Sequence, residues 1–486
     1  MTDTTAPVTD KQPVSKWLIL TAVMLGTIMT PLDGSIVNTV LPSITAFFHT
    51  DISIVQWVPT VYLLTICCLI LLFGRLGDMI GYKRVFLYGL AAFTVTSILC
   101  GSSQNVWMLI IFRALQGLAA SMIMAVGFAI VTAAFQPTER GKALGIYAIG
   151  IAVGLGLGPT LGGLVTEHLS WRYVFFINVP IGIAALIWGS RIIPRSSTKP
   201  GQRLDWAGAL TALVFLLALL LYANRGEDWG WASPLPLALL AAAIVFGILF
   251  FWRERTSDQP MLDLGMFTNR VFSFASLSSL LSFMALYSLV FLTPFYLTFV
   301  LHYNILKVGL VMIASPVVTL VVAPLSGAAS DRVGTRVFAV CGMFIAALGL
   351  FFFSRLQESS TVHDIIWRLA VTGLGVGMFQ SPNNSTVMGN VSPWQLGIAS
   401  GILAAMRNVG MVLGIAVAGA ILYSLAPVSM SEHTGSFTPA EIKEFVHGLH
   451  WAYTAGALLA ATAALTSLLA IKRPAQTRTG GLTRES

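Results

Sequence analysis

Fourteen apolar segments, each long enough to cross a lipid bilayer, run through this chain of 486 residues. A membrane helix rises 1.5 Å per residue and needs about 20 apolar residues to cross about 30 Å of hydrocarbon. The segments lie near residues 17–39, 54–73, 85–101, 106–131, 142–165, 172–193, 204–223, 234–252, 271–297, 308–327, 336–354, 364–387, 399–424 and 449–471. The ten-residue stretches of alternating polarity that mark a membrane β-barrel do not occur in the sequence. The sequence therefore predicts an all-α polytopic membrane protein with 14 transmembrane helices.

Basic residues are distributed unevenly between the loops on the two sides of the predicted membrane. If the N-terminus is cytoplasmic, twenty of the 28 lysines and arginines fall in cytoplasmic loops or tails. The outer loops then hold only Arg172, Arg225, Lys307, Arg355 and Lys443. This asymmetry follows the positive-inside rule, so we expect a multi-pass protein of the plasma (bacterial inner) membrane with both termini cytoplasmic. Because topology explains the net charge of +8, no nucleic-acid partner is expected.

The sequence carries none of the motifs that would indicate an enzyme or a cofactor site. The four cysteines (Cys67, Cys68, Cys100 and Cys341) fall within spans and lack zinc-ligand spacing. The sequence contains no P-loop, H-E-x-x-H or catalytic serine pattern. We therefore expect no enzymatic activity, no metal and no cofactor, and any uphill transport must draw on an ion gradient.

The second part of the chain repeats the first at an offset of about 255 residues. A loop motif, the start of a span and a glycine pattern each occur twice, in the same order. The first copies are Gly74-x3-Asp78-x2-Gly81-x-Lys83, Ile110-Ile111-Phe112-Arg113 and Gly145-x8-Gly154-x3-Gly158. The second copies are Gly327-x3-Asp331-x2-Gly334-x-Arg336, Ile365-Ile366-Trp367-Arg368 and Gly401-x8-Gly410-x3-Gly414. Six spans therefore correspond to six spans, as in transporters built from two parallel repeats.

Two spans between the repeats have no counterpart, and they complete the expected domain organisation. We expect a cytoplasmic N-terminal tail over 1–16 and an N-terminal six-helix bundle over 17–195. Two extra transmembrane helices over 196–255 would link this bundle to a C-terminal six-helix bundle over 256–471, followed by a cytoplasmic tail over 472–486.

The loop from Gly74 to Arg84 is the most specific stretch of the chain. Its glycines permit a tight turn between two helices, and its charges can pair or face lipid headgroups. Anchoring in the membrane would not by itself require acids at the repeated positions Asp78 and Asp331. With this loop the sequence resembles the major facilitator superfamily, whose signature loop has the form G-x3-D-x2-G-x-[K/R].

Within that superfamily the chain is similar to the fourteen-span drug:proton antiporter branch, the multidrug efflux type. The matching stretches are Leu32-Asp33-Gly34-Ser35-Ile36-Val37-Asn38-Thr39-Val40-Leu41-Pro42, Leu109-x3-Arg113-x2-Gln116-Gly117, Gly145-x8-Gly154-x3-Gly158-Pro159-x2-Gly162-Gly163 and Trp171-Arg172-x3-Phe175-x-Ile177-Asn178-x-Pro180. The resemblance covers essentially the full chain, although Ile415 stands where the repeat would need a counterpart of Pro159. It implies the major facilitator fold, with two six-helix bundles plus two extra central helices, and export by alternating access.

Two groups of residues are candidates for changing the conformation. Small residues four apart let a neighbouring helix approach closely, and proline removes one backbone hydrogen bond. The fifth span can thus form either a static contact or a moving seam, and the resemblance implies the moving seam. The candidates are Gly74, Asp78, Gly81, Lys83, Arg84, Asp331 and Arg336 in the loops, and Gly154, Gly158, Pro159, Gly162 and Gly163 in the span.

Asp33 is the one acid in the interior of a span, and an ionised carboxylate there costs roughly 2.5–3.5 kcal/mol. Asp33 lies 17 residues beyond Lys16, roughly 25 Å above the inner edge of the membrane. Arg113 lies seven residues inside the outer end of the fourth span, roughly 10 Å down. The two side chains therefore sit at similar depths, and in the family fold both spans line the central cavity. We expect an ion pair that is broken when Asp33 takes up a proton.

Other polar and aromatic residues of the spans are candidates for the substrate cavity. They are Asn38, Gln380, Asn383, Asn384, Arg407, Asn408, Trp57, Tyr62, Tyr287, Phe291 and Phe379. The amides and Arg407 can equally serve in hydrogen bonds between helices. The aromatic rings could hold a flat lipophilic ligand, and cation–π contact would help to retain an organic cation.

The leading hypothesis is a proton-coupled antiporter that exports lipophilic drugs or antibiotics, with Asp33 as the coupling carboxylate. An exporter of a dedicated endogenous metabolite or lipid, and a transport-inactive sensor or channel, are the alternatives. With one intramembrane acid, neutral or monovalent compounds are easier to accommodate than dications. We expect a monomer in the lipid bilayer that binds a small lipophilic substrate and protons. The sequence does not decide whether an adaptor protein binds the outer loops.

Overall fold

The computed structural model describes residues 15–50, 52–195, 204–303, 305–425 and 439–470. In these ranges fourteen helices are long and apolar enough to cross a membrane, and this confirms the predicted all-α fold with 14 spans. The expected tails over 1–16 and 472–486 lie, apart from residues 15 and 16, outside the described residues.

The helices up to residue 192, which we call the first half, form six spans; one short helix lies between the first two spans, and another begins the sixth. Asn105 caps the fourth span, because its side chain accepts a hydrogen bond from the Met108 amide at 2.8 Å. The helices are α1 (Lys16–Phe48), α2 (Ile52–Val55), α3 (Trp57–Ile80), α4 (Tyr82–Gly101), α5 (Val106–Ala134), α6 (Arg140–His168), α7 (Tyr173–Phe176) and α8 (Asn178–Ile192).

The helices from residue 270 onward, the second half, form six further spans. A capping box begins α15, in which Thr361 and Asp364 satisfy each other's backbone amides. The helices are α11 (Arg270–Phe295), which continues as a π-helical turn (Tyr296–Val300), α12 (Ile305–Met312), α13 (Ala314–Val333), α14 (Thr335–Phe353), α15 (Val362–Gly389), α16 (Leu396–Leu425) and α17 (Pro439–Leu469). The tenth span consists of α12 and α13 together.

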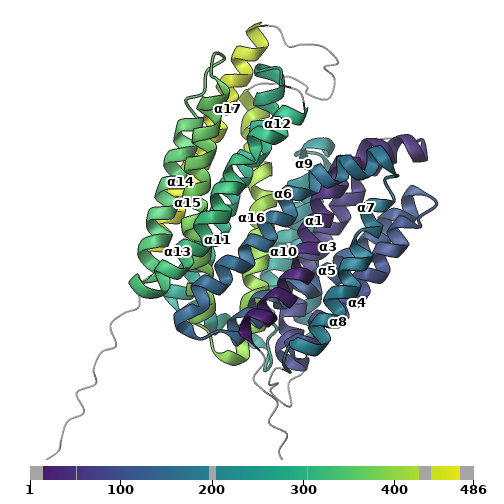
Figure 1. Ribbon diagram of the computed structural model, residues 1–486, viewed down its shortest axis with the longest axis vertical. Coiled ribbons are helices and arrows are strands. Elements are labelled where there is room, and N and C mark those ends of the chain that lie inside the picture. The colour runs from purple at the N-terminus through teal and green to yellow at the C-terminus, as the bar shows by residue number, and fades with distance from the viewer. Residues whose placement is uncertain (1–14, 51, 196–203, 304, 426–438, 471–486) are drawn as a thin grey trace, which may run out of the picture.

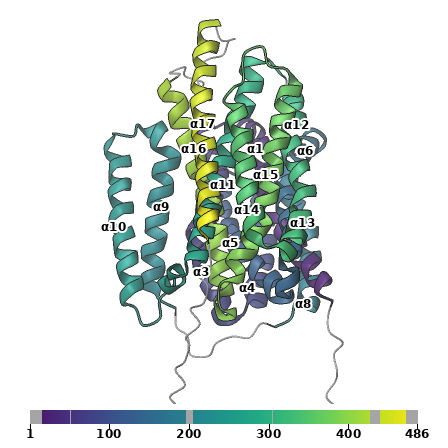
Figure 2. The same ribbon diagram turned by 90° about the vertical axis from the view of Figure 1, so that its left-hand side faces the viewer.

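Two helices between the halves form an antiparallel hairpin on one side of the molecule. They are α9 (Trp206–Trp229) and α10 (Pro234–Thr256). Helix α9 packs against α3 of the first half and α16 of the second, while α10 packs on the outside of α9 (Figure 2). The hairpin therefore touches both halves mainly through α9.

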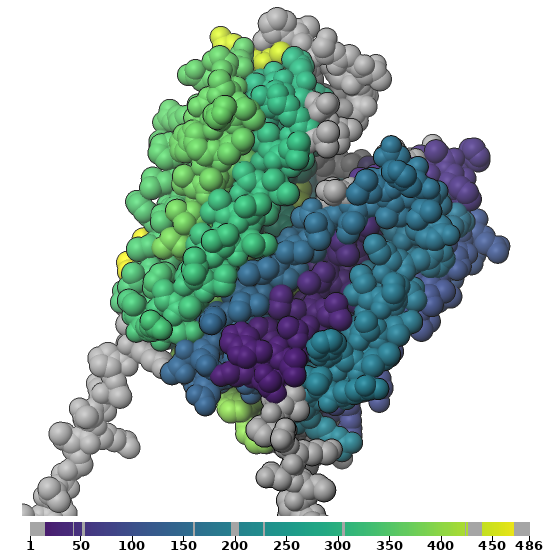
Figure 3. All heavy atoms as spheres, viewed as in Figure 1, coloured from purple at the N-terminus to yellow at the C-terminus, as the bar shows by residue number. Residues whose placement is uncertain are grey.

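The two halves meet at one end of the bundle and separate toward the other. Because the spans alternate in direction and are even in number, α1 begins and α17 ends at the same end, which we call the terminal end. Near this end α3 packs on α16, and α6 packs on α13. Toward the opposite, far end the halves diverge, as the ribbon and the space-filling view show (Figures 1 and 3).

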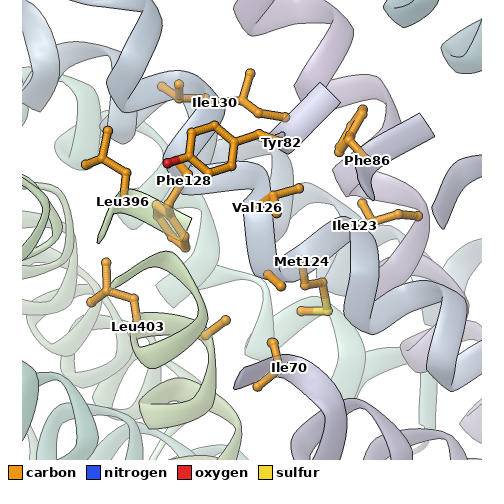
Figure 4. Close-up of a cluster of buried hydrophobic side chains, with 14 of the residues drawn as sticks. Ile70, Tyr82, Phe86, Ile123, Met124, Val126, Phe128, Ile130, Leu396 and Leu403 are labelled. Atoms are coloured by element: carbon orange, nitrogen blue, oxygen red, sulfur yellow. The ribbon is translucent and has the colours of Figure 1, made fainter. Parts of the chain in front are cut away.

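The hydrophobic clusters follow the same division. One cluster at the terminal end contains side chains of both halves, among them Ile70, Tyr82 and Phe128 with Leu396 and Leu403 (Figure 4). A second cluster runs through the second half and a third lies in the far part of the first half. A small fourth cluster joins α3 and α9 to α16. Since buried apolar area contributes about 25 cal/mol per Å², contact between the halves is stabilised mainly at the terminal end.

Candidate functional site

The two copies of the repeated loop make the same turn at the terminal end. Gly81 has φ of +97° between α3 and α4, and Gly334 has φ of +106° between α13 and α14. Residues with a side chain rarely adopt a positive φ, so this turn explains why both copies of the loop have glycine at this position. Beside the first turn, Lys83 Nζ donates to the Ser190 carbonyl at 2.7 Å, whereas Arg84 and Arg336 are exposed.

The repeated acids bind the beginning of a helix in the opposite half. Asp78 of α3 accepts hydrogen bonds from the Gly397 and Ile398 amides of α16, at 2.7 and 2.9 Å. Asp331 of α13 accepts from the Gly141 and Lys142 amides of α6, at 2.9 and 3.1 Å. A carboxylate at a helix N-terminus satisfies unpaired amides and interacts favourably with the helix dipole. The two acids therefore clamp the halves together at the terminal end.

Glycines bring the backbones of the two halves into contact beside these clamps. A Cβ built on Gly74 would lie 2.7 Å from the Gly397 carbonyl oxygen. A Cβ on Gly141 would lie 2.5 Å from the Gly327 carbonyl oxygen, and the Ser381 hydroxyl donates to the Gly141 carbonyl. Any side chain here would hold the halves apart.

The glycines of the fifth span from Gly154 onward have a different neighbour. Gly154, Gly158 and Gly162 of α6 face α1 of the same half, where a Cβ on Gly154 would lie 2.8 Å from the Pro31 ring. Gly163 has open space around it. This face therefore lies against the helix that carries Asp33, rather than between the two halves.

Asp33 lies in the interior of the first half, where its carboxylate accepts three side-chain hydrogen bonds. Arg113 donates to Oδ2 in a buried ion pair, and the Gln116 and Asn178 amides donate to Oδ1 at 3.0 and 2.9 Å. Asp33, Arg113, Gln116 and Asn178 all have no exposed surface. The ion pair expected from the sequence is thus formed, but it is enclosed among α1, α4, α5 and α8 instead of facing an open cavity.

The guanidinium of Arg113 is held by further contacts. Its Nη1 also donates to Gln116 Oε1 at 2.7 Å, and its Nε donates to the Val58 carbonyl at 3.2 Å. Its Cζ lies 3.9 Å from the ring centroid of Tyr62, a cation–π contact. Arg113 Nη2 and Asn178 Oδ1 are buried without a hydrogen-bond partner among the described residues. The three donors to Asp33, which are Arg113, Gln116 and Asn178, suit an ionised carboxylate. Protonation would place a hydroxyl group, itself a donor, among these donors.

Sequence reasoning did not identify Gln116 and Asn178 as partners of the carboxylate. Both lie inside stretches that carry the family resemblance, and a buried amide beside an intramembrane acid was the available signal. Gln116 also donates to the Ser97 hydroxyl at 2.9 Å, so α4 joins the network.

The candidate cavity residues lie in different environments. Tyr62 donates its hydroxyl to the Thr30 carbonyl at 2.9 Å and is 1% exposed, and Phe379 is 1% exposed within the cluster of the second half. The expectation that both line an open cavity is therefore wrong for this conformation, because neighbouring side chains cover both rings. Asn383 is also buried, and its amide donates to the Ala275 carbonyl at 3.1 Å.

The remaining candidates are exposed or half-buried, except for Arg407 and Asn408, which are buried. Asn38 is exposed and lines a pocket of about 180 Å³ between α1, α3, α9 and α16. Trp57 lies with its ring centroid 5.0 Å from the Arg225 guanidinium carbon, and Phe291 packs on Phe295. Tyr287, Gln380 and Asn384 are half-buried, and Arg407 and Asn408 are 7% and 6% exposed.

No group of three or more histidine, cysteine, aspartate or glutamate side chains is placed to hold a metal ion among the residues the structure describes.

Comparison with known proteins identifies the family. The family model described as "Major Facilitator Superfamily" matches residues 23–415 and 275–485. The chain is 34% identical to the riboflavin transporter RibZ of Clostridioides difficile over 82% of this chain and 87% of that protein. It is 32% identical to the multidrug resistance protein Stp of Mycobacterium tuberculosis over 88% of this chain and 80% of that protein. The human organic anion transporter MFSD10 shares the fold with a TM-score of 0.64 at 15% identity, over 93% of this chain and 99% of that one. The chain therefore belongs to the Major Facilitator Superfamily, a family of membrane transporters and not of enzymes.

Proposed function

We propose that this protein is a proton-coupled antiporter that exports lipophilic drugs or antibiotics by alternating access. The observation that carries the proposal is the enclosed carboxylate of Asp33, paired with Arg113 and hydrogen-bonded by Gln116 and Asn178. An ionised acid within the membrane is costly in free energy, so its presence indicates a functional role. An acid whose hydrogen bonds change on protonation can couple the binding of a proton to a change of conformation. The similarity to the multidrug resistance protein Stp supports a drug as cargo.

The proton step follows from the hydrogen-bond geometry. When Asp33 takes up a proton, its bond with Arg113 is lost and the amides of Gln116 and Asn178 must reorient. The ionised and protonated forms then favour different packing of α1, which carries Asp33 and contacts the glycine face of α6. A proton can drive the change of conformation only through such a difference in affinity between the two states.

Orientation is part of the same proposal. We infer that the terminal end faces the cytoplasm, because the basic residues concentrate on that side. The described conformation is then closed toward the cytoplasm by the Asp78 and Asp331 clamps and diverges toward the outside.

A dedicated metabolite is the second candidate cargo. It is favoured by the similarity to the riboflavin transporter RibZ, which covers 82% of this chain. The fold and the Asp33 network would serve this function equally well.

Purified protein in proteoliposomes with an imposed pH gradient tests both candidates. The panel contains chemically unrelated dyes and antibiotics together with riboflavin. We expect gradient-dependent movement of several unrelated lipophilic compounds, abolished when a protonophore collapses the gradient. Movement of riboflavin alone would support the metabolite transporter, and no movement of any compound would contradict both.

A further inference from the structure

Arg407 of α16 is a cation within the membrane that has no acidic partner among the described residues. It lies eleven residues from the start of α16, about 16 Å from the terminal end of that helix, and is 7% exposed. No carboxylate and no hydrogen-bond acceptor of the described chain pairs with its guanidinium, in contrast to Arg113. An arginine at this depth needs an anionic partner or a water-filled cavity. The absence of such a partner among the described residues therefore suggests that a ligand provides the negative charge.

Its polar neighbours come from both halves and are uncharged. The groups that interact electrostatically with the guanidinium are the hydroxyls of Tyr147 on α6 and Tyr287 on α11 and the thiol of Cys67 on α3. Arg407 therefore lies between the halves. Six residues before it, Gly401 packs closely on Ile70 and Gly74 of α3, which places Arg407 directly beyond the closed contact of the terminal end.

The other charges of the spans do not balance Arg407. Asp33 and Arg113 neutralise each other inside the first half. The remaining charged residues of the described spans lie within about two turns of a helix end. Midway along the space between the halves, one positive charge is therefore left, and a low local dielectric strengthens its attraction for an anion.

A pocket between α1, α3, α9 and α16 shares one wall residue with the surroundings of Arg407. Cys67, a neighbour of Arg407, also lines the pocket of about 180 Å³. The other walls combine apolar and amide or hydroxyl side chains: Leu63, Leu64, Leu220, Val412, Pro59, Asn38, Thr60 and Asn224. Asn408 lies one helical turn before Val412, and its Nδ2 is buried without a hydrogen-bond partner among the described residues. A pocket of this size accommodates a small aromatic group.

We propose that Arg407, together with the hydroxyl of Tyr287, anchors the anionic group of the substrate, so that the transporter prefers lipophilic aromatic monoanions. Arginine can bind a carboxylate or a similar oxyanion through two parallel hydrogen bonds. The single uncompensated charge selects one negative charge on the ligand. This inference rests on the proposed export function and narrows its substrate class, and it replaces the organic cation that the aromatic side chains alone had indicated.

Three ligands that share a naphthalene ring isolate the contribution of charge. Purified protein is titrated calorimetrically with 2-naphthoate, with the neutral 2-naphthamide and with naphthalen-2-ylmethylammonium. We expect 2-naphthoate to bind at least roughly tenfold more tightly than 2-naphthamide, because a hydrogen bond to a charged group contributes about 1.5–3 kcal/mol. The ammonium compound should bind most weakly. Equal affinity for the three ligands, a preference for the cation, or no binding of 2-naphthoate at millimolar concentration would overturn the proposal without any variant.

Variants then assign the preference to one residue. Arg407→Gln should abolish the difference between 2-naphthoate and 2-naphthamide, and Arg407→Lys should retain part of it. Arg368→Gln is the matched control, because it removes a cation of the second half that already pairs with Asp364; it should leave the preference unchanged. A preference that survives in a folded Arg407→Gln protein contradicts the assignment. Because binding needs no gradient, a protein that prefers the anion but transports nothing would contradict only the proposed function.

Discussion

At the scale of single residues, the ion pair of Asp33 and Arg113 is buried on every side, and its energetics differ from those of a surface pair. Desolvation of two charges offsets much of their attraction, so a buried pair adds little net stability. Removal of one partner is different, because the other charge stays buried and uncompensated. Substitution of one partner therefore tests the role of the pair better than the number of its hydrogen bonds does.

We predict that Arg113→Gln lowers the free energy of unfolding by about 3–5 kcal/mol, since it leaves the Asp33 carboxylate unpaired. The double variant Arg113→Gln with Asp33→Asn should recover much of this loss, because no buried charge remains. Thermal unfolding of the purified variants in detergent measures both effects. A double variant no more stable than Arg113→Gln alone would show that the pair is not the source of the loss.

The residue scale also shows how far the sequence could predict the site. The depths of Asp33 and Arg113 follow from counting residues along two helices, and the pair is formed as predicted. Asn178 follows the short helix α7, so the direction of its side chain depends on packing that no residue count provides. The sequence wrongly predicts cavity positions for Tyr62 and Phe379, because helices that are apolar on all sides do not indicate which face is covered.

At the scale of helices, the repeated loop and the glycines decide how the halves touch. The sequence predicted the repeat, and the structure shows that each acid binds the helix start of the other half. This reciprocal contact could not be predicted, because a sequence repeat specifies two similar units but not the surfaces through which they meet. The glycines permit the contact, since α6 and α13 approach until their backbones touch at Gly141 and Gly327.

We predict that Gly141→Ala weakens closure of the terminal end. The added Cβ would lie 2.5 Å from the Gly327 carbonyl oxygen and from Asp331 Oδ1, so the helices must separate. Gly156→Ala on the same helix is the control, because no atom lies within 4 Å of its Cβ. Pulsed EPR between labels at Thr138 and Val333, in a cysteine-free background, should show longer distances for Gly141→Ala only. Equal distributions in both variants would contradict a steric role for this glycine.

At the scale of the whole molecule, the fourteen spans, the hairpin and the closed terminal end form one arrangement. Apolar segment length predicted the spans, because each must match the same bilayer thickness. The positions of the halves relative to each other could not be predicted, since under the proposed alternating access the same sequence must support more than one packing. The hairpin contacts α3 and α16, one helix of each half, so it lies beside the seam that opens in the proposed transport cycle.

Coupling through Asp33 is the central claim, and transport by Asp33→Asn proteoliposomes tests it most directly. Two assays use the compound that the wild-type protein moves best: accumulation driven by a pH gradient, and exchange of labelled for unlabelled compound without any gradient. We predict that Asp33→Asn keeps exchange, because the cavity is intact, and loses gradient-driven accumulation, because an amide does not exchange a proton. Asp33→Asn protein that still accumulates substrate against its concentration gradient when the pH gradient is imposed would contradict the claim.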